Sequence, residues 1–239
     1  VGCPLKKEVA RGRGAQLLRE PDVVQRLVAA LVKALDCPVT VKVRAGWEPG
    51  EITAPDIARL CVEAGAKAVT VHGRTKMGWY KERVDKGVIR AVREAVPREV
   101  PVIGNGDVVD LASAISMFEE TGCDAVMIGR GAVGNPWLFS RIVRYLETGE
   151  VLREPTFAEV RDLFREHMAS VQDMWGAKAG YRQVRIYGFY YFGRFPVPNI
   201  RARLGSTKTC EQLYAEIDEI EREARDLVPG PAALMTEGD

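Results

Sequence analysis

Residues 38–43, Pro38-Val39-Thr40-Val41-Lys42-Val43, form a β-branched run that is typical of a buried β-strand. Three similar runs follow it: Lys67-Ala68-Val69-Thr70-Val71, Val100-Pro101-Val102-Ile103 and Asp124-Ala125-Val126-Met127-Ile128. The runs start 24 to 33 positions apart, which is the length of one strand and one helix. The sequence therefore predicts four strands that alternate with helices.

Amphipathic segments between these runs predict the helices. Pro21 opens the first of them, and Thr53-Ala54-Pro55-Asp56 predicts a second that begins with a capping box. Such alternation predicts a parallel sheet, and its regular repetition favours a (β/α)₈ barrel over an open sheet.

The predicted barrel is incomplete. Gly2-Cys3-Pro4 has the character of a strand exit, so four strands and the end of a fifth are visible where a closed barrel has eight. We expect an α/β fold, the C-terminal half of a (β/α)₈ TIM barrel, either as a fragment or as two copies that complete each other. After Glu154 the pattern is helical, which predicts a barrel domain over residues 1–153 and a small all-helical domain over residues 154–239.

Composition excludes several classes of protein. The 239 residues contain no apolar run long enough to cross a bilayer. We expect no signal peptide before the predicted fold. Five cysteines without a CxxC pair argue against a disulfide framework or a zinc site, and no other metal-binding cluster is evident. We expect a cytoplasmic protein with no metal and no membrane partner, while its oligomeric state cannot be deduced.

Charge is balanced in total but uneven along the chain. Lys and Arg number 34 against 33 Asp and Glu, a net charge of +1, so any site for a polyanion must be local. Residues 178–208 contain no acidic residue and seven basic ones: Lys178, Arg182, Arg185, Arg194, Arg201, Arg203 and Lys208.

Two glycine-rich loops follow the third and fourth predicted strands, at the barrel end where ligands bind. They are Gly104-Asn105-Gly106-Asp107 and Gly129-Arg130-Gly131. Glycines let backbone N–H groups approach an anion, a following helix adds its positive end, and Arg130 can add a bidentate contact. Their joint placement favours a phosphate site over two ordinary turns.

Three single residues also occupy strand ends. Lys42 interrupts a β-branched run and faces either the barrel lumen or, as a snorkelling side chain, the outer surface. His72 directly follows a strand, and Cys3 stands between Gly2 and Pro4, which favours an exposed thiol over a small buried hydrophobe. We expect His167 to be a surface or packing residue and the other four cysteines to be structural.

Aromatic residues are interleaved with the arginines of the basic segment: Tyr181, Tyr187, Phe189, Tyr190, Tyr191, Phe192 and Phe195. This mixture suits stacking on bases and contact with phosphates. For the aromatics we favour a helical core, and for at least some of the arginines we favour contact with RNA. Arg201 and Arg203 are the chosen candidates, because they lie on a predicted helix after Pro196 and Pro198.

Several of these motifs, taken in order, resemble the tRNA-dihydrouridine synthases, and most closely their bacterial branch. The resemblance rests on Gly2-Cys3-Pro4 with Lys6-Lys7, on 14–18, on 38–47, on 69–75, on 101–107 and on 121–139. It covers residues 1–150 well. The C-terminal part is similar only in outline, since Arg185-Ile186-Tyr187 stands where the family has a Lys-His or Arg-His pair.

The resemblance implies an FMN-binding barrel and a helical tRNA-binding domain, which together reduce uridine in tRNA to 5,6-dihydrouridine. NADPH would reduce FMN, the flavin would give hydride to C6 of the uracil, and Cys3 would protonate C5. Positions that match flavin contacts are Lys42, His72, Asn105, Gly106, Asp107, Gly129 and Arg130; candidates for tRNA contact are Arg185, Arg201 and Arg203. The family's first barrel strands, which carry further flavin contacts, are absent, so this fragment is expected to bind FMN poorly.

Two other functions remain open from the sequence. One is an FMN barrel oxidoreductase that acts on a small molecule, against which the Gly-Cys-Pro motif and the basic segment argue. The other is a truncated, non-catalytic chain that binds only RNA or phosphate.

Overall fold

The computed structural model describes residues 1–78 and 82–227. Two compact units divide the chain, the first being Val1–Gly131 and the second beginning at Ala132. The domain boundary predicted at residues 153 and 154 stays a prediction.

In the described residues of the first unit, four parallel strands form one sheet. They pair in chain order, β1 (Thr40–Arg44), β2 (Ala68–His72), β3 (Val102–Asn105) and β4 (Ala125–Met127). Thr40 lies opposite Ala68, Val69 opposite Val102, and Ile103 opposite Ala125. Each strand lies within two residues of its predicted run, and the predicted α/β fold class is confirmed.

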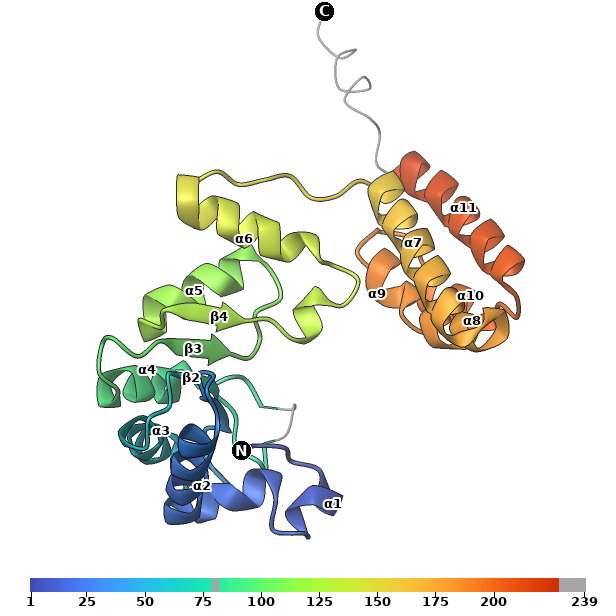
Figure 1. The fold of residues 1–239 in the computed structure, drawn as a ribbon. Helices are drawn as coiled ribbons and strands as arrows, with labels where there is room; N and C mark the ends of the chain where they lie inside the picture. Colours follow the sequence, from blue (N-terminus) through green and yellow to red (C-terminus); the bar gives the residue numbers. More distant parts are fainter. Residues whose placement is uncertain (79–81, 228–239) are drawn as a thin grey trace, which may run out of the picture. The chain divides into compact units, whose positions relative to one another are not determined.

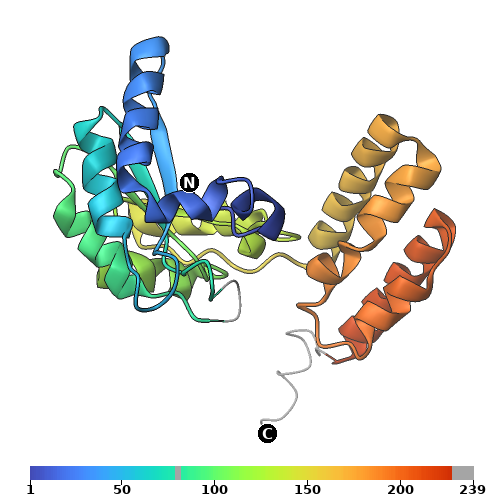
Figure 2. The same cartoon turned by 90° about the horizontal axis from the view of Figure 1, so that it is seen from below.

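Helices cover one side of this sheet. In chain order they are α2 (Pro21–Ala34), α3 (Ala54–Glu63), α4 (Lys86–Ala95) and α5 (Leu111–Thr121). Each packs beside the next one in this order (Figures 1 and 2). Val41 and Val43 are buried, whereas Thr40 and Lys42, which alternate with them, are exposed. Because successive strand residues point to opposite faces, the helices bury the valines and leave Lys42 on the uncovered face.

The start of α3 differs from the prediction. No side chain caps this helix, and Thr53 donates its hydroxyl to the carbonyl oxygen of Leu18 at 3.0 Å. The predicted capping box is therefore wrong, because the threonine ties α3 to the 3₁₀-helix η1 (Gly14–Arg19) instead. A capping box occurs at α5, where Asp110 and Ser113 exchange hydrogen bonds.

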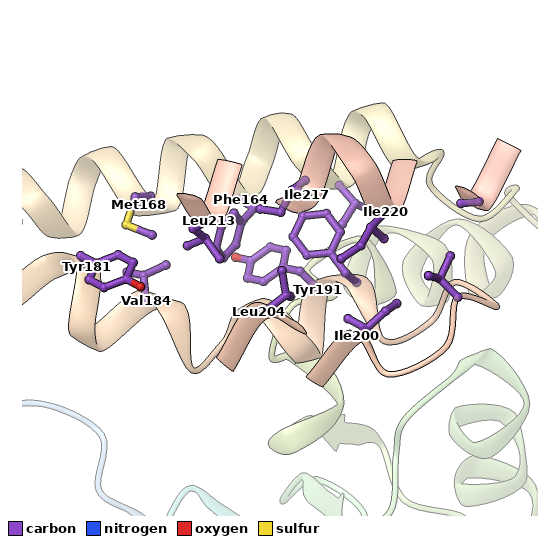
Figure 3. Packing of buried hydrophobic residues seen from close by; sticks show 14 residues of the cluster. Phe164, Met168, Tyr181, Val184, Tyr191, Ile200, Leu204, Leu213, Ile217 and Ile220 are labelled. Carbon is purple, nitrogen blue, oxygen red and sulfur yellow. The ribbon is translucent and has the colours of Figure 1, made fainter. Parts of the chain in front are cut away.

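Helices are the regular structure in the described part of the second unit. Its helices are α6 (Trp137–Thr148), α7 (Phe157–Trp175), α8 (Ala177–Arg185), α9 (Gly188–Phe192), α10 (Ile200–Ser206) and α11 (Cys210–Leu227). This unit therefore also includes α6, which lies before the predicted all-helical segment of residues 154–239. Figure 3 shows side chains from α7 to α11 meeting in one core, in which Phe164, Leu204 and Ile217 are almost completely buried. Apolar residues spaced three and four apart on each helix supply this core.

Candidate functional site

The C-terminal ends of the strands border a cavity of about 520 Å³. The sheet register aligns Arg44, His72, Asn105 and Met127 in one row at this edge. Val1 to Pro4 and the loops after β3 and β4 complete its wall. A cavity of this size is typical of sites for small molecules and cofactors.

Lys42 and Asn105 form a hydrogen-bonded chain across the sheet. The Lys42 Nζ donates to Asn105 Oδ1 at 2.9 Å, and Asn105 Nδ2 donates to the carbonyl oxygen of Met127 at 2.8 Å. The chain thus joins β1, β3 and β4. Partial burial, helped by the nearby charge of Arg44, lowers the pKa of Lys42. Lys42 therefore lines the cavity. Of the two orientations predicted for it, the structure has the one toward the barrel lumen, where a ligand can contact the side chain.

His72 is a neutral, hydrogen-bonding residue in this environment. Burial, followed by the charges of Arg44, Lys42 and Arg74, lowers the pKa of His72 to about 3. Arg74 Nη1 lies 3.3 Å from His72 Nε2. A guanidinium can only donate, so Nε2 accepts and the proton of the neutral ring resides on Nδ1.

Arg74 ties the loop after β2 to the loop after β3. Its side chain is 4% exposed, and its Nη2 lies 2.6 Å from both carboxylate oxygens of Asp107. Asp107 also accepts a hydrogen bond from the backbone N–H of Val84. Burial acts in the opposite direction, but the bonds from Arg74 and Val84 hold the pKa of Asp107 below its usual range. Arg130 stands farther off, with Nη2 3.7 Å from Asp107 Oδ1.

Main-chain hydrogen bonds fix the segment that carries Cys3. Arg44 donates from Nε to the carbonyl oxygen of Gly2 at 3.0 Å, and the N–H of Ala15 donates to the carbonyl oxygen of Cys3 at 2.9 Å. Gly14 has a φ of +58°, and a Cβ there would lie 2.5 Å from the Cys3 carbonyl oxygen. Only glycine permits this close approach. The thiol of Cys3 is exposed and borders the cavity, as predicted.

The two glycine-rich loops differ in how open they are. A Cβ at Gly106 would lie 2.8 Å from the Val84 side chain, whereas a Cβ at Gly129 would meet no atom within 4 Å. The start of α5 already holds the carboxylate of Asp110, 2.7 Å from the Ser113 N–H. An anion would therefore find open backbone at Gly129 rather than at the beginning of α5.

The predicted cofactor residues and Cys3 thus come together at one cavity: Cys3, Lys42, His72, Asn105, Gly106, Asp107, Gly129 and Arg130. Sequence reasoning assigned no role to Arg44 or Arg74, which organise the site. Arg44 ends β1, Arg74 lies two residues after β2, and both are buried, so an arginine at the end of a strand was the available signal.

The predicted RNA-contacting arginines lie in the second unit. Arg185 and Arg201 border a groove of about 160 Å³, and Arg203 forms ion pairs with Glu216 and Glu223 at 2.5 and 2.8 Å. Arg203 is 22% exposed, because these two glutamates of α11 engage its guanidinium. Its role and those of the other site residues stay predictions.

Within residues 1–78 and 82–227, no group of three or more His, Cys, Asp or Glu side chains could hold a metal ion. None of the helices described in this structure combines the length and apolar character needed to span a membrane.

Comparison with known proteins agrees with the motifs. The family model described as Dihydrouridine synthase (Dus) matches residues 1–224. Similar curated proteins include tRNA-dihydrouridine synthase B of Proteus vulgaris, Klebsiella pneumoniae and Escherichia coli (strain K12), which are 40%, 42% and 41% identical over 191 residues. These matches cover 80% of this chain and 58%, 59% and 59% of the relatives' lengths.

Proposed function

The chain belongs to the dihydrouridine synthase family, and we propose that the protein that carries it reduces uridine in tRNA to 5,6-dihydrouridine. The resemblance inferred from the motifs is thereby confirmed at the level of the family. The chain spans a little under three fifths of the curated relatives it matches, so the activity belongs to the proposal. The observation that carries it is the exposed Cys3 thiol, fixed beside the cavity that Lys42 and Asn105 line.

We propose FMN as the cofactor of this cavity. The residues fit such a group, because they combine the cation of Lys42, the amide of Asn105, the exposed cation of Arg130 and the open backbone at Gly129. A phosphate is well matched by a guanidinium and backbone N–H groups. In this proposal Gly129 and Arg130 hold the phosphate.

The other matched positions, Lys42, His72, Asn105, Gly106 and Asp107, would hold the flavin ring and its side chain. When bound, FMN supplies the reducing equivalents for the uracil, with NADPH as the external reductant.

Cys3 is the proposed general acid. A thiol held at a fixed point beside the substrate can deliver a proton to C5 of the uracil as the ring is reduced. The hydrogen bonds to the carbonyl oxygens of Gly2 and Cys3 support this role, since they fix the backbone and leave the side chain available. Burial raises the pKa of Cys61 to about 11, which makes that thiol a poor alternative.

The proposed substrate is tRNA, contacted in part by Arg185 and Arg201 of the helical unit. Arg203, the third predicted residue, is engaged by Glu216 and Glu223 and is expected to contribute little. A uracil within folded RNA must leave its stack to reach a cavity at the strand ends. The proposed location is cytoplasmic, where tRNA is processed.

The test uses the purified full-length protein with FMN, NADPH and an unmodified tRNA transcript. Mass spectrometry of the digested RNA measures conversion of uridine to a nucleoside that is heavier by two hydrogen atoms. The expected result is conversion by the wild-type protein and strongly reduced conversion by Cys3→Ala. NADPH oxidation with small substrates, but never with tRNA, would overturn the proposal in favour of a small-molecule oxidoreductase.

A further inference from the structure

We propose that Phe189, Tyr190 and Arg201 form a platform on the helical unit that stacks against an unpaired RNA base. The inference rests on the proposed function and makes it more specific, because it names which residues receive an unstacked nucleotide. It follows from the different positions that the aromatic residues of the basic segment take in the structure.

Most of these aromatic residues belong to the helical core. Tyr181, Tyr191 and Phe192 are buried in it, and Tyr187 and Phe195 pack against it. Figure 3 shows Tyr191 among the core side chains of α7, α10 and α11. The favoured sequence interpretation, an aromatic core, therefore describes these five residues.

Phe189 and Tyr190 differ from the others. They are 38% and 50% exposed, and neither belongs to the core cluster. Their rings meet edge to face at 5.9 Å between centroids, and the Arg201 guanidinium lies 5.2 Å from the centre of the Phe189 ring. The three side chains thus form a preassembled set of flat surfaces, which loses little conformational entropy when a ligand stacks on it.

A groove of about 160 Å³ accompanies this platform. Arg185, Ile186, Phe189 and Tyr190 contribute from one side, and Arg201, Leu204 and Gly205 from α10. Ile200 and Leu204, four positions apart on α10, are buried, and Leu204 forms the floor shared by the core and the groove; Arg201 and Gly205, each one position later, also border the groove. A Cβ at Gly205 would meet no atom within 4 Å, so this wall of the groove is open.

Charge selects RNA as the occupant. The groove is lined by two arginines and no acidic residue, and it lies within the stretch of residues 178–208 that contains none. Arg185 is anchored by hydrogen bonds to the carbonyl oxygens of Gly205 and Thr207, at 3.1 and 2.8 Å, which keeps its charge at the groove. Cations beside exposed aromatic rings match a nucleotide, whose base stacks and whose phosphate is anionic.

The first experiment replaces the aromatic rings by an aliphatic side chain or by another aromatic ring. Phe189→Leu and Tyr190→Leu remove the π surfaces, and Phe189→Tyr and Tyr190→Phe preserve them. With an unmodified tRNA transcript and the full-length protein, each leucine variant should weaken binding by about 5-fold to about 150-fold, the range for one base stacked on an aromatic ring. The conservative variants should bind as the wild type does. Equal affinity of the leucine variants and the wild type would overturn the proposal.

A second experiment adds atoms instead of removing them. Gly205→Leu places a side chain in the open part of the groove, where the backbone leaves room for it. It should weaken tRNA binding without lowering the melting temperature, since a helical glycine is replaced by a better helix former. A stable variant with unchanged affinity would contradict the platform.

The two proposals fail in different ways. If the wild-type protein neither binds nor reduces tRNA, the proposed function is wrong. If it does both and the leucine variants retain full affinity, only the platform is wrong.

Discussion

Lys42 on β1 and Asn105 on β3 are joined by a hydrogen bond of 2.9 Å that crosses above the intervening strand β2. The bond fixes a cation at the cavity. We expect Lys42→Met to weaken FMN binding to the full-length protein by about tenfold or more, because hydrogen bonds to charged groups contribute about 1.5–3 kcal/mol. Flavin fluorescence titration measures this. Lys33→Met, on the exposed side of α2, is the matched control and should bind as the wild type does.

Arg74 and Arg130 both approach Asp107 but should behave in opposite ways. Arg74 is 4% exposed and Arg130 64%, so Arg74→Met should destabilise the fold by about 3 kcal/mol and Arg130→Met by less than about 1 kcal/mol. Urea unfolding measures both.

Arg130→Ala should weaken FMN binding by more than tenfold, since it removes a charge-assisted contact to phosphate. Unchanged flavin content in purified Arg130→Ala would exclude the phosphate role.

His72 should make the fold sensitive to acid. Its pKa is about 3 in the folded protein, against 6.5 for a free histidine, so the unfolded state takes up a proton first as pH falls. The stability that depends on neutral His72 is fully present above pH 6.5 and is lost below it, by up to about 1.4 kcal/mol per pH unit. Urea unfolding between pH 6.5 and 4 should show this slope in the wild type and in His167→Gln. If His72→Gln shows the same slope, the assignment is wrong.

Cys3 should be needed for reduction of uridine and dispensable for reduction of the flavin. In the full-length enzyme Cys3→Ala should slow oxidation of the reduced flavin by tRNA at least a hundredfold, a usual contribution of a general acid. Stopped-flow single turnovers separate this step from reduction by NADPH, which should keep its wild-type rate. Cys37→Ala, at the other exposed cysteine, is the control. A wild-type tRNA step in Cys3→Ala would rule out proton donation.

Arg201 and Arg203 should contribute differently to tRNA binding. Each phosphate contact adds somewhat less than one unit to the slope of log affinity against log salt. Arg203 is engaged by Glu216 and Glu223, so we expect Arg201→Ala to flatten the slope and Arg203→Ala to leave it nearly unchanged. Filter binding at several salt concentrations measures both. Identical slopes for Arg201→Ala and the wild type would show that Arg201 touches no phosphate.

Sequence reasoning located the strands well because β-branched runs and helical spacing are local signals. It found the cavity residues for a related reason: in parallel sheets the strand ends share one edge, so residues such as His72 and Asn105 meet wherever their strands pair. Arg74 and Asp107 also meet at this edge, but their pairing depends on loop paths that no local pattern encodes.

Long-range ion pairs mark the limit of such reasoning. In a run of arginines, nothing local distinguishes Arg201, which lies against the Phe189 ring, from Arg203, which is bound by two glutamates of α11. The same applies to Thr53, whose hydroxyl could accept a hydrogen bond from a backbone N–H of α3 but instead donates one to the carbonyl oxygen of Leu18. Only the packed arrangement decides which partner a polar side chain takes.

The clamp on Gly2 and Cys3 acts through carbonyl oxygens, which every amino acid possesses. The course of this segment is consequently independent of the group that position 3 carries. A serine, a selenocysteine or a cysteine alkylated with a fluorophore would be presented at the same point of the cavity rim. Position 3 is thus suited to a fluorescent label that reports occupancy of the cavity. A cysteine there is also suited to crosslinking with an electrophilic RNA analogue, which would trap the complex of protein and RNA.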